Sequence, residues 1–562
     1  MKKRIPIGVS NFKKLKNENY YFVDKSIFIK DIIDDGSEVI LIPRPRRFGK
    51  TVNMSMLKYF FEKTPEDNCE LFQDLKIWKE EGYRQYCGKY PVIYISFKDI
   101  KYNYWKDSLE AIQMLISDEY KNHKYLVSAD SFEENELEYF NNIITQKVTI
   151  SDVVISLKKL TEYLYKHHKE RVVIIIDEYD TPIECSYVKG FYTELIDFMK
   201  NFLGGCLKDN VYLEKGILTG ILRVAKESIF SGLNNLKVST ILDGQYGAYF
   251  GLLEEEVSEV LEYYKVEKSR DEIKRWYNGY IFGGNTVYNP WSILNAADNC
   301  NEFLRPYWVN TSGNDLVKKL ITRGNSNLKK ELENLLRGSS IVKEINENIV
   351  YKDVDEDSNS IWSFLLFNGY LKCVDKRLED TALVCELCIP NLEVRLLYRQ
   401  IVKSWFSESI NNDKYDLMMK SLINGDIKTF SKVLKEFVFK TFSYFDTCGQ
   451  ESEKTYHAFV LGLLVSLDGT YEVKSNKESG YGRYDVMLIP KDTTKLGIVF
   501  EFKSVDQDDN ETLDISADLA LKQIEGKKYS QELMDRGVNK VFEVGIAFQG
   551  KDVLVKWREI IG

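Results

Sequence analysis

Residues 39–51 read VILIPRPRRFGKT, and the order of residue types predicts a strand, a tight basic loop and a helix. The first four residues are aliphatic, and their number suits a short buried strand. The loop ends in Gly49, Lys50 and Thr51, and apolar residues then recur at spacings of three and four as far as Phe61. Such a loop can surround a phosphate group with backbone N–H groups at the start of a helix.

A loop of this kind binds ATP when its lysine reaches the terminal phosphates and its hydroxyl residue holds Mg²⁺. The standard motif has a glycine where this chain has Arg44, so the match is partial. The loop arginines also suit nucleic acid, but we favour neutralisation of ATP phosphates. We expect the nucleotide to contact the following loop residues: Arg46, Arg47, Phe48, Gly49, Lys50 and Thr51.

A second apolar strand, residues 171–176, runs into Asp177 and Glu178. The aspartate would support Mg²⁺, and the glutamate would orient or deprotonate the attacking water. A strand that simply ends in acidic residues at a sheet edge is the alternative, which the upstream Gly-Lys-Thr disfavours. Thr219 and Arg223 follow a further apolar run and are candidate sensors of the γ-phosphate, with an ordinary strand end as the alternative.

Strands alternate with helices through the first 250 residues, which predicts an α/β fold with a parallel sheet and crossover helices. Six motifs resemble, in their order and wording, the bacterial AAA-ATPase-like family: RPRRFGKT at 44–51, DEYD at 177–180, LTGILR at 218–223, SGLNNL at 231–236, WYNGY at 276–280 and YNPW at 288–291. An arginine at the position of Arg44 is usual in that family. The resemblance covers nearly the whole chain and implies a P-loop NTPase sheet and a C-terminal PD-(D/E)XK nuclease-like domain.

Two strands near the C-terminus carry residues suited to phosphodiester chemistry. Asp485 opens an apolar strand, and Glu501 and Lys503 lie at the end of the next one. Side chains alternate along a strand, so Glu501 and Lys503 face the same side. If the strands are adjacent, Asp485 and Glu501 can bind one divalent cation, beside which Lys503 can position a water for hydrolysis. Charged residues alternating on a solvated strand face are the alternative.

The family resemblance extends to this region. The residues that carry it are, in order, Glu453, Asp485, Glu501, Lys503, Gln523 and Tyr529. It implies that Glu453, on the opening helix of the domain, is a further metal ligand and that Gln523 faces the catalytic site. The cofactors implied are ATP and Mg²⁺ or Mn²⁺.

Composition constrains the class of protein. The chain has 562 residues, of which 44% are hydrophobic and 29% charged, as in ordinary globular proteins. Its net charge of −9 disfavours a protein coated in nucleic acid but allows a local basic groove. No apolar run approaches 18 residues and no signal peptide follows Met1, so we expect a cytoplasmic protein without a membrane segment.

The nine cysteines are scattered, so no disulfide framework is expected and a reducing compartment is predicted. Cys385 and Cys388 have the spacing of zinc ligands, but a second such pair is missing from the sequence. We therefore expect both to be buried strand residues.

Three parts are expected: an AAA-ATPase-like P-loop domain over 1–250, a mostly helical lid or coupling region over 251–445, and a restriction-endonuclease-like α/β domain over 446–562. The function that follows is ATP binding and hydrolysis combined with metal-dependent cleavage of nucleic acid, DNA in preference to RNA, by a chain that can form a homo-oligomer. Two alternatives remain open. One is a nucleotide-dependent switch or scaffold whose nuclease-like domain binds nucleic acid without cutting, and the other is a nuclease with a structural, non-hydrolysing nucleotide site.

Overall fold

The chain divides into two compact units, the first comprising Met1–Val317 and Ser340–Val394 and the second Lys318–Ser339 and Arg395–Gly562. The domain boundaries expected at 250 and 445 stay predictions. The computed structural model describes residues 2–128, 132–223, 234–299, 303–309, 315–323, 326–336, 338–356, 359–407, 412–441, 460, 463–464, 467, 469–475, 478–479, 482–505 and 511–561.

A five-stranded parallel sheet forms the centre of the first unit, which confirms the predicted α/β fold. Its order is β2-β3-β4-β1-β5. The strands are β1 Val39–Pro43, β2 Val92–Ser96, β3 Val172–Asp177, β4 Leu213–Gly220 and β5 Leu236–Val238. Strands β1 and β3 are buried along their whole length, which is why their sequences are continuous aliphatic runs.

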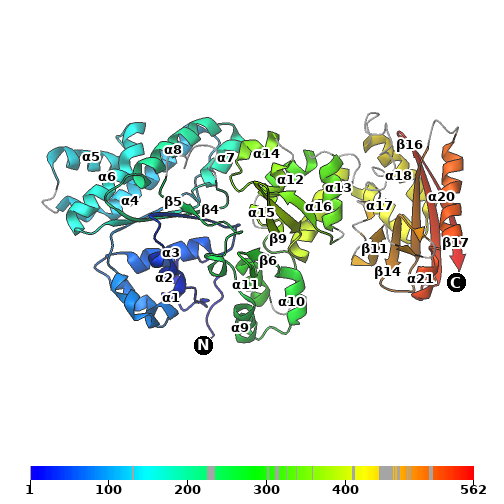
Figure 1. Cartoon of the computed structure of the whole chain (residues 1–562), viewed down its shortest axis with the longest axis horizontal. Helices are drawn as coiled ribbons and strands as arrows, with labels where there is room; N and C mark the ends of the chain where they lie inside the picture. Colours follow the sequence, from blue (N-terminus) through cyan, green and yellow to red (C-terminus); the bar gives the residue numbers. More distant parts are fainter. Residues whose placement is uncertain are drawn as a thin grey trace. The chain divides into compact units, whose positions relative to one another are not determined.

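Helices cover both faces of this sheet, with α1 to α3 on one face and α4 to α8 on the other (Figure 1). The helices are α1 Phe12–Asn17, α2 Ile27–Asp34, α3 Lys50–Phe61, α4 Trp105–Asn122, α5 Glu134–Ile144, α6 Ile150–His168, α7 Thr181–Lys189 and α8 Tyr192–Leu207. Short 3-10 helices lie before β2 and after α4: η1 Asn68–Phe72, η2 Lys76–Lys79, η3 Glu81–Tyr86 and η4 Lys124–Ser128. Helix α6 begins at a capping box, in which Thr149 and Asp152 each bond the other's backbone N–H.

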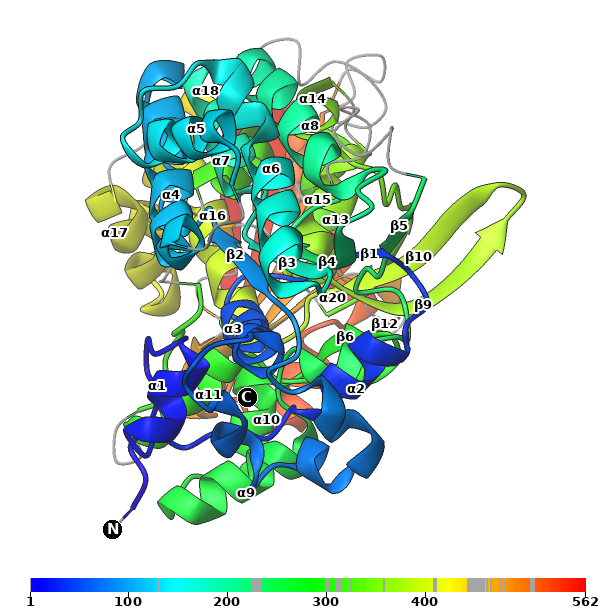
Figure 2. The same cartoon turned by 90° about the vertical axis from the view of Figure 1, so that its left-hand side faces the viewer.

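The remainder of the first unit is mostly helical and also contains two small antiparallel sheets. The helices are η5 Gly247–Tyr249, α9 Glu254–Tyr264, α10 Arg270–Tyr277, α11 Pro290–Asp298, α14 Tyr351–Glu356 and α15 Ser360–Phe367. One sheet pairs β6 Tyr280–Phe282 with β7 Asn285–Val287, and the other has the order β8-β10-β9, with β8 Ile341–Glu344, β9 Lys372–Glu379 and β10 Ala382–Cys388. The β9–β10 hairpin projects from its neighbours (Figure 2). Cys385 and Cys388 lie on β10 as expected. Cys385 is buried as predicted, whereas Cys388 is only half-buried, which corrects that part of the prediction.

The second unit is built on a mixed sheet of order β11-β14-β15-β16-β17, in which only β15 and β16 of the described strands are parallel. Its strands are β11 Tyr471–Ser475, β14 Val486–Pro490, β15 Gly497–Ser504, β16 Lys540–Gln549 and β17 Asp552–Ile561, and a short hairpin joins β12 Glu478–Ser479 to β13 Gly482–Arg483. Helix α20, Leu513–Lys527, packs against β15, β16 and β17. The other helices are α13 Ser326–Leu336, α17 Asn412–Ile423, α18 Ile427–Thr441 and α21 Gln531–Asp535.

Two helices have residues in both units. Helix α12, Asp315–Arg323, belongs to the first unit as far as Val317, and α16, Leu392–Ser407, belongs to it as far as Val394. The first turn of α16 therefore belongs to the first unit.

A disulfide joins Cys69 of η1 to Cys87, which follows η3, with a Cα–Cα distance of 6.0 Å. No disulfide framework was expected from the sequence, and this single bond was not predicted. Two 3-10 helices between the cysteines bring together side chains that lie 18 positions apart. A spacing of this length does not by itself predict a disulfide.

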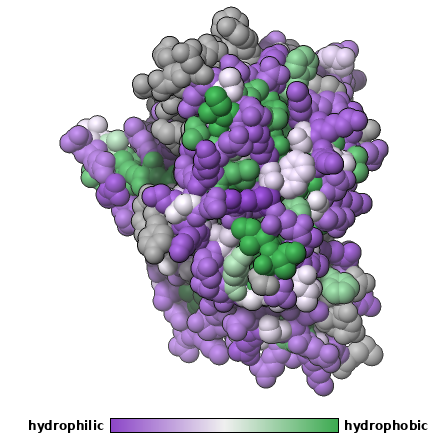
Figure 3. Space-filling model, turned by 90° about the vertical axis from the view of Figure 1, so that its right-hand side faces the viewer, coloured by the Kyte–Doolittle hydropathy of each residue, from purple (hydrophilic) through white to green (hydrophobic). Residues whose placement is uncertain are grey.

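The helices that the structure describes include none long and apolar enough to cross a membrane. The face of the molecule in Figure 3 is mainly hydrophilic, and its apolar residues form small groups. Small apolar groups of this kind are normal on the surface of a globular protein.

Candidate functional site

The predicted phosphate-binding loop connects the carboxyl end of β1 to the first residue of α3. Gly49 and Arg47 have φ angles of +84° and +67°. Glycine adopts this left-handed conformation readily, whereas an arginine is strained in it. Strained backbone persists where the surrounding structure holds it, and such positions cluster at functional sites.

The side chain of Lys50 folds back into the loop. Its Nζ donates hydrogen bonds to the carbonyl oxygens of Arg44 at 3.0 Å and Pro45 at 2.9 Å. Burial lowers the pKa of Lys50, and the nearby carboxylate of Glu178 opposes this effect. The ammonium group thus lies within the loop, held by neutral carbonyl groups.

Asp177 occupies the carboxyl end of β3 and is fully buried. Its Oδ2 accepts hydrogen bonds from the hydroxyls of Thr51 at 2.9 Å and Ser96 at 3.4 Å. Among the described residues none donates to Oδ1, although this atom is also buried. Burial, followed by the charge of Glu178, raises the pKa of Asp177 to about 6.

These groups fit a Mg²⁺ ion. A buried carboxylate oxygen without a described partner, next to a threonine hydroxyl, provides the hard oxygen ligands that Mg²⁺ prefers. Ser96 was not assigned from the sequence, although it ends the apolar strand β2, which pairs with β3. In a parallel sheet such a position lies at the same edge as Asp177, and this was the available signal.

Glu178 follows β3 in a left-handed conformation, with φ of +52°. Its Oε2 accepts a hydrogen bond from the Thr181 hydroxyl at 3.2 Å. A glutamate in this conformation is strained, and its carboxylate is held by the start of α7. The side chain therefore has a defined position next to Asp177 and close enough to Lys50 to affect its pKa.

Three further loop residues make contacts within the protein. Arg46 Nη2 forms an ion pair with both carboxylate oxygens of Glu184 on α7. The guanidinium of Arg47 lies over the ring of Trp291, 4.3 Å from its centroid. Phe48 is buried. The side chain of Phe48 is thus part of the core, and any contact of this residue with phosphate falls to its backbone.

Arg44, the residue that replaces the first glycine of the standard motif, is fully buried. Its Nη1 donates hydrogen bonds to the carbonyl oxygens of Pro43 at 2.8 Å and Ser239 at 2.7 Å. Its guanidinium also lies over the rings of Phe250 and Phe282. The neutralisation of phosphate that we favoured for this arginine is therefore corrected, because the side chain fastens the loop to the core.

The end of β4 lies between the loop and Asp177, because β4 pairs with both β1 and β3. Thr219 is fully buried and its hydroxyl donates to the Ile42 carbonyl at 2.9 Å. Arg223, three residues beyond the strand, is half-buried. Contact of either residue with a γ-phosphate stays a prediction.

Asp180 and Tyr179 hold the segment that follows β4, a role that the sequence did not reveal. Asp180 Oδ2 accepts hydrogen bonds from the N–H groups of Ile221 at 2.7 Å and Leu222 at 3.0 Å, and the Tyr179 hydroxyl donates to the Leu222 carbonyl at 2.5 Å. A Cβ added at Gly220 would lie 2.5 Å from Asp180 Oδ1. The DEYD motif thus joins the ends of β3 and β4. This role can be recognised only when it is known that the two strands are neighbours.

In the second unit, Asp485 and Glu501 lie side by side. Strands β14 and β15 pair with Val486 opposite Phe500, and Asp485 Oδ2 accepts a hydrogen bond from the N–H of Phe502 at 2.8 Å. Burial raises the pKa of Asp485, while the Phe502 N–H and the charge of Lys503 act in the opposite direction. The strand adjacency on which a shared metal depends is present.

Lys503 and Gln523 both contact Glu501, which is buried on β15. Lys503 Nζ lies 3.6 Å from Glu501 Oε1, so the two side chains share one face of the strand as predicted. The Gln523 amide of α20 donates a hydrogen bond to the same oxygen. Tyr529 hydrogen-bonds Gln523.

Glu453, predicted as a further metal ligand, lies outside the described residues. Within the described parts, we find no cluster of three or more His, Cys, Asp or Glu side chains that could hold a metal ion. Asp485 and Glu501 supply a pair of carboxylates, which fits Mg²⁺ because this ion keeps several water ligands and is often held by one or two carboxylates.

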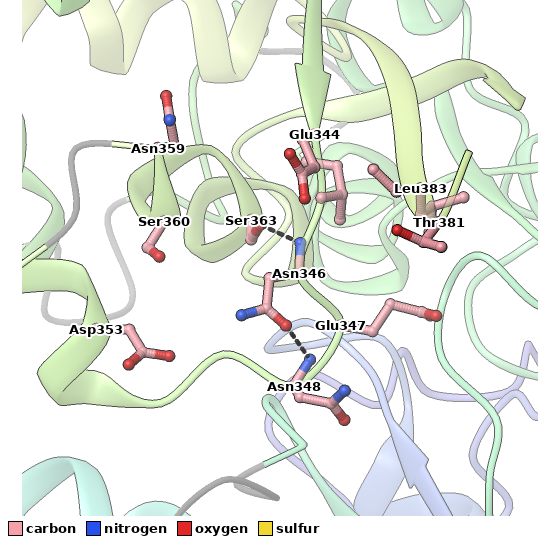
Figure 4. Close-up of a pocket in the computed structure, with 12 residues that line it drawn as sticks. Glu344, Asn346, Glu347, Asn348, Asp353, Asn359, Ser360, Ser363, Thr381 and Leu383 are labelled. Carbon is pink, nitrogen blue, oxygen red and sulfur yellow. Dashed lines mark hydrogen bonds between the residues drawn. The ribbon is translucent and has the colours of Figure 1, made fainter. Parts of the chain in front are cut away.

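A separate cavity of about 490 Å³ lies in the first unit (Figure 4). Glu344, Glu347 and Asp353 line it, together with asparagine and serine side chains, and the described lining includes neither lysine nor arginine. Carboxylates of this density repel phosphate groups. We therefore do not assign this cavity to the nucleotide.

Comparison with known proteins supports two separate domains. Residues 6–230 match the model of a family described as a predicted AAA-ATPase, and residues 451–558 match the model of the PD-(D/E)XK nuclease superfamily. A protein of Azotobacter chroococcum mcd 1, named as an uncharacterized protein in the vnfD 5′ region, is 26% identical over 555 residues, which cover 97% of this chain and 96% of that protein.

Proposed function

Because residues 6–230 form a domain of the predicted AAA-ATPase family and residues 451–558 a domain of the PD-(D/E)XK nuclease superfamily, we propose that this chain hydrolyses ATP and cleaves nucleic acid. DNA is the proposed substrate, in preference to RNA. The setting is the cytoplasm, where ATP, Mg²⁺ and nucleic acid are all available. The nucleotide state of the first domain would control cleavage by the second.

In the proposed ATPase, four residues carry the reaction. Lys50 would exchange its contacts with loop carbonyls for the terminal phosphates, and Thr51 and Asp177 would hold Mg²⁺. The ion, when bound, neutralises charge on the phosphate oxygens. The Glu178 carboxylate would accept the proton of the attacking water, a role supported by its strained, fixed position.

In the proposed nuclease, Asp485 and Glu501 would hold a divalent cation, which supplies Lewis-acid activation of the phosphodiester. Lys503 would position the attacking water or stabilise the charge that develops on the phosphate. Gln523 would keep the Glu501 carboxylate in place. The observation that carries the proposal is the 3.6 Å contact between Lys503 and Glu501, on a strand whose neighbour brings in Asp485.

The test is cleavage of plasmid, single-stranded DNA and RNA by the whole chain, with Mg²⁺ or Mn²⁺, in the presence and absence of ATP. Lys503→Ala should abolish cleavage, and Lys50→Ala should abolish ATP hydrolysis and any effect of ATP on cleavage. Two lysines serve as matched controls. Lys495→Ala changes an exposed residue of the second unit, and Lys58→Ala changes the helix that follows the loop.

The outcomes separate the alternatives. Cleavage that persists in Lys503→Ala would contradict the assignment of the nuclease site. Nucleic acid binding by the wild type without cleavage under any condition would favour a nucleotide-dependent switch or scaffold. Cleavage without release of phosphate from ATP would favour a structural nucleotide site.

A further inference from the structure

A buried carboxylate is connected through Trp308 to the phosphate-binding loop, and it lies on an element beyond the 6–230 region of the ATPase family. Glu393, in the first turn of α16, is fully buried. Its Oε1 accepts hydrogen bonds from the N–H groups of Tyr307 at 2.5 Å and Trp308 at 2.6 Å, and its Oε2 accepts one from the Ser292 hydroxyl at 2.8 Å. One side chain therefore fixes the backbone at 307–308 to the start of α11.

Trp308 extends this network to the loop itself. Its indole Nε1 donates a 3.0 Å hydrogen bond to the carbonyl oxygen of Arg46, and its ring is 1% exposed. The ring packs against those of Tyr280 and Tyr370, with centroid separations of 6.1 and 5.3 Å. Its position is thus set by Glu393 through the backbone and by aromatic neighbours around the ring.

The direction of the Arg46 carbonyl matters for phosphate binding. In a planar trans peptide the carbonyl and the following N–H point in opposite directions. Because the Arg46 carbonyl points to Trp308, the Arg47 N–H points away from Trp308. The same hydrogen bond keeps the Arg46 carbonyl oxygen from turning to the other side of the loop. Arg47 also has a strained positive φ, a conformation that must be held by its surroundings.

Helix α11 adds a second contact. Trp291 lies against the Arg47 guanidinium, while the neighbouring Ser292 bonds Glu393. Phe48, the next loop residue, packs its ring against Tyr280, with centroids 4.9 Å apart. The WYNGY and YNPW motifs therefore contribute side chains that pack against the loop.

We propose that Glu393, acting through Trp308, is a positioning residue of the nucleotide site, which holds the loop in the conformation that binds ATP. This inference rests on the proposed ATPase function. It makes the start of α11, the backbone at 307–308 and the start of α16 part of the nucleotide site, although all three lie outside the region that matches the ATPase family.

The test compares Trp308→Phe with Trp362→Phe in the full chain. The first keeps an aromatic ring but removes the donor to Arg46. The second makes the same change at a tryptophan of the same unit that is also 1% exposed. We expect Trp308→Phe to raise the Kd and KM for Mg-ATP about tenfold, the effect of one hydrogen bond, with little change in kcat. Trp362→Phe should bind Mg-ATP like the wild type.

Glu393→Gln is the second variant, and it should raise the Kd in the same direction. Thermal midpoints without ATP show whether either variant is merely destabilised. Equal ATP affinity in the wild type, Trp308→Phe and Glu393→Gln would overturn this inference alone, as would an equal loss of affinity in Trp308→Phe and Trp362→Phe. Absence of ATP binding by the wild type would instead overturn the proposed function, and this inference with it.

Discussion

The Thr51 hydroxyl donates a 2.9 Å hydrogen bond to Asp177 Oδ2, although 126 positions separate the two residues. They meet because β1 and β3 both pair with β4 and end at the same edge of a parallel sheet. The hydroxyl and the carboxylate thereby come together from two motifs that were recognised separately in the sequence, and they form the proposed Mg²⁺ site.

Replacement of Thr51 tests that site directly. Thr51→Val keeps the shape of the side chain but removes the hydroxyl, and we expect Mg-dependent ATP hydrolysis to fall by about 100-fold or more. Thr51→Ser keeps the hydroxyl and should retain most of the activity. Phosphate release at several Mg²⁺ concentrations provides the measurement, and equal rates in the two variants would exclude Thr51 as a metal ligand.

Loss of the Asp180 carboxylate should destabilise the first unit. Asp180→Ala leaves the buried N–H groups of Ile221 and Leu222 without their acceptor, which costs about 3 kcal/mol. Asp180→Asn keeps one oxygen that can accept both hydrogen bonds, so its loss should be smaller. Chemical unfolding gives the free energies, with the exposed Asp197→Ala on α8 as control; an alanine variant no less stable than this control would contradict the role.

The elements that local sequence determines were predicted well. Residues 39–43 and 172–177 form buried strands because each is a continuous aliphatic run, and both end at the motif expected there. The alternation of Glu501 and Lys503 follows from strand geometry alone. These features need only the spacing of neighbouring residues.

Contacts between segments that are distant in the sequence could not be predicted from the sequence. Trp308 meets Arg46 across 262 positions, and Asp180 meets Leu222 across 42. Neither pair has a local pattern, because each depends on the order of strands or on the packing of a whole subdomain. The burial of Arg44 was missed for the same reason, since its partner Ser239 is distant in the sequence.

Gln523 should affect metal affinity in the proposed nuclease site. Its amide bonds the Glu501 carboxylate, and loss of such a supporting hydrogen bond weakens metal binding about 10- to 100-fold. Gln523→Ala should therefore need a higher Mg²⁺ concentration for half-maximal cleavage, with much of the rate restored at saturation. Gln531→Ala, on α21, is the control. An unchanged Mg²⁺ dependence in Gln523→Ala would remove Gln523 from the site.

The Cys69–Cys87 disulfide should stabilise the first unit. Closing a loop between residues 18 positions apart restricts the unfolded chain and contributes about 3 kcal/mol. A reducing agent should lower the thermal midpoint of the wild type and leave that of the Cys69→Ser, Cys87→Ser double variant unchanged. A wild-type midpoint that does not respond to complete reduction, verified by thiol titration, would show that the bond makes no contribution.

Glu393 should give the stability of the first unit a specific dependence on pH. Burial raises its pKa from 4.5 to about 7, although the Ser292 hydroxyl and the N–H groups of Trp308 and Tyr307 favour the ionised form. The folded protein thus holds this proton more tightly than the unfolded chain. The contribution of Glu393 to stability is therefore greatest below pH 4.5 and declines as the pH rises to about 7.

Glu393→Gln removes this titration and resembles the protonated carboxyl. The free energy of unfolding of the wild type, measured relative to this variant, should fall by up to about 3 kcal/mol between pH 4.5 and 7 and stay constant above that range. Unfolding by urea at several pH values provides the measurement. Glu134→Gln changes an exposed residue of α5, and its difference from the wild type should not vary with pH in this way. A constant difference between the wild type and Glu393→Gln would mean that Glu393 ionises at the same pH in the folded and unfolded chain. The buried surroundings of Glu393 near Trp308 would then leave its pKa at the value of a solvated carboxylate.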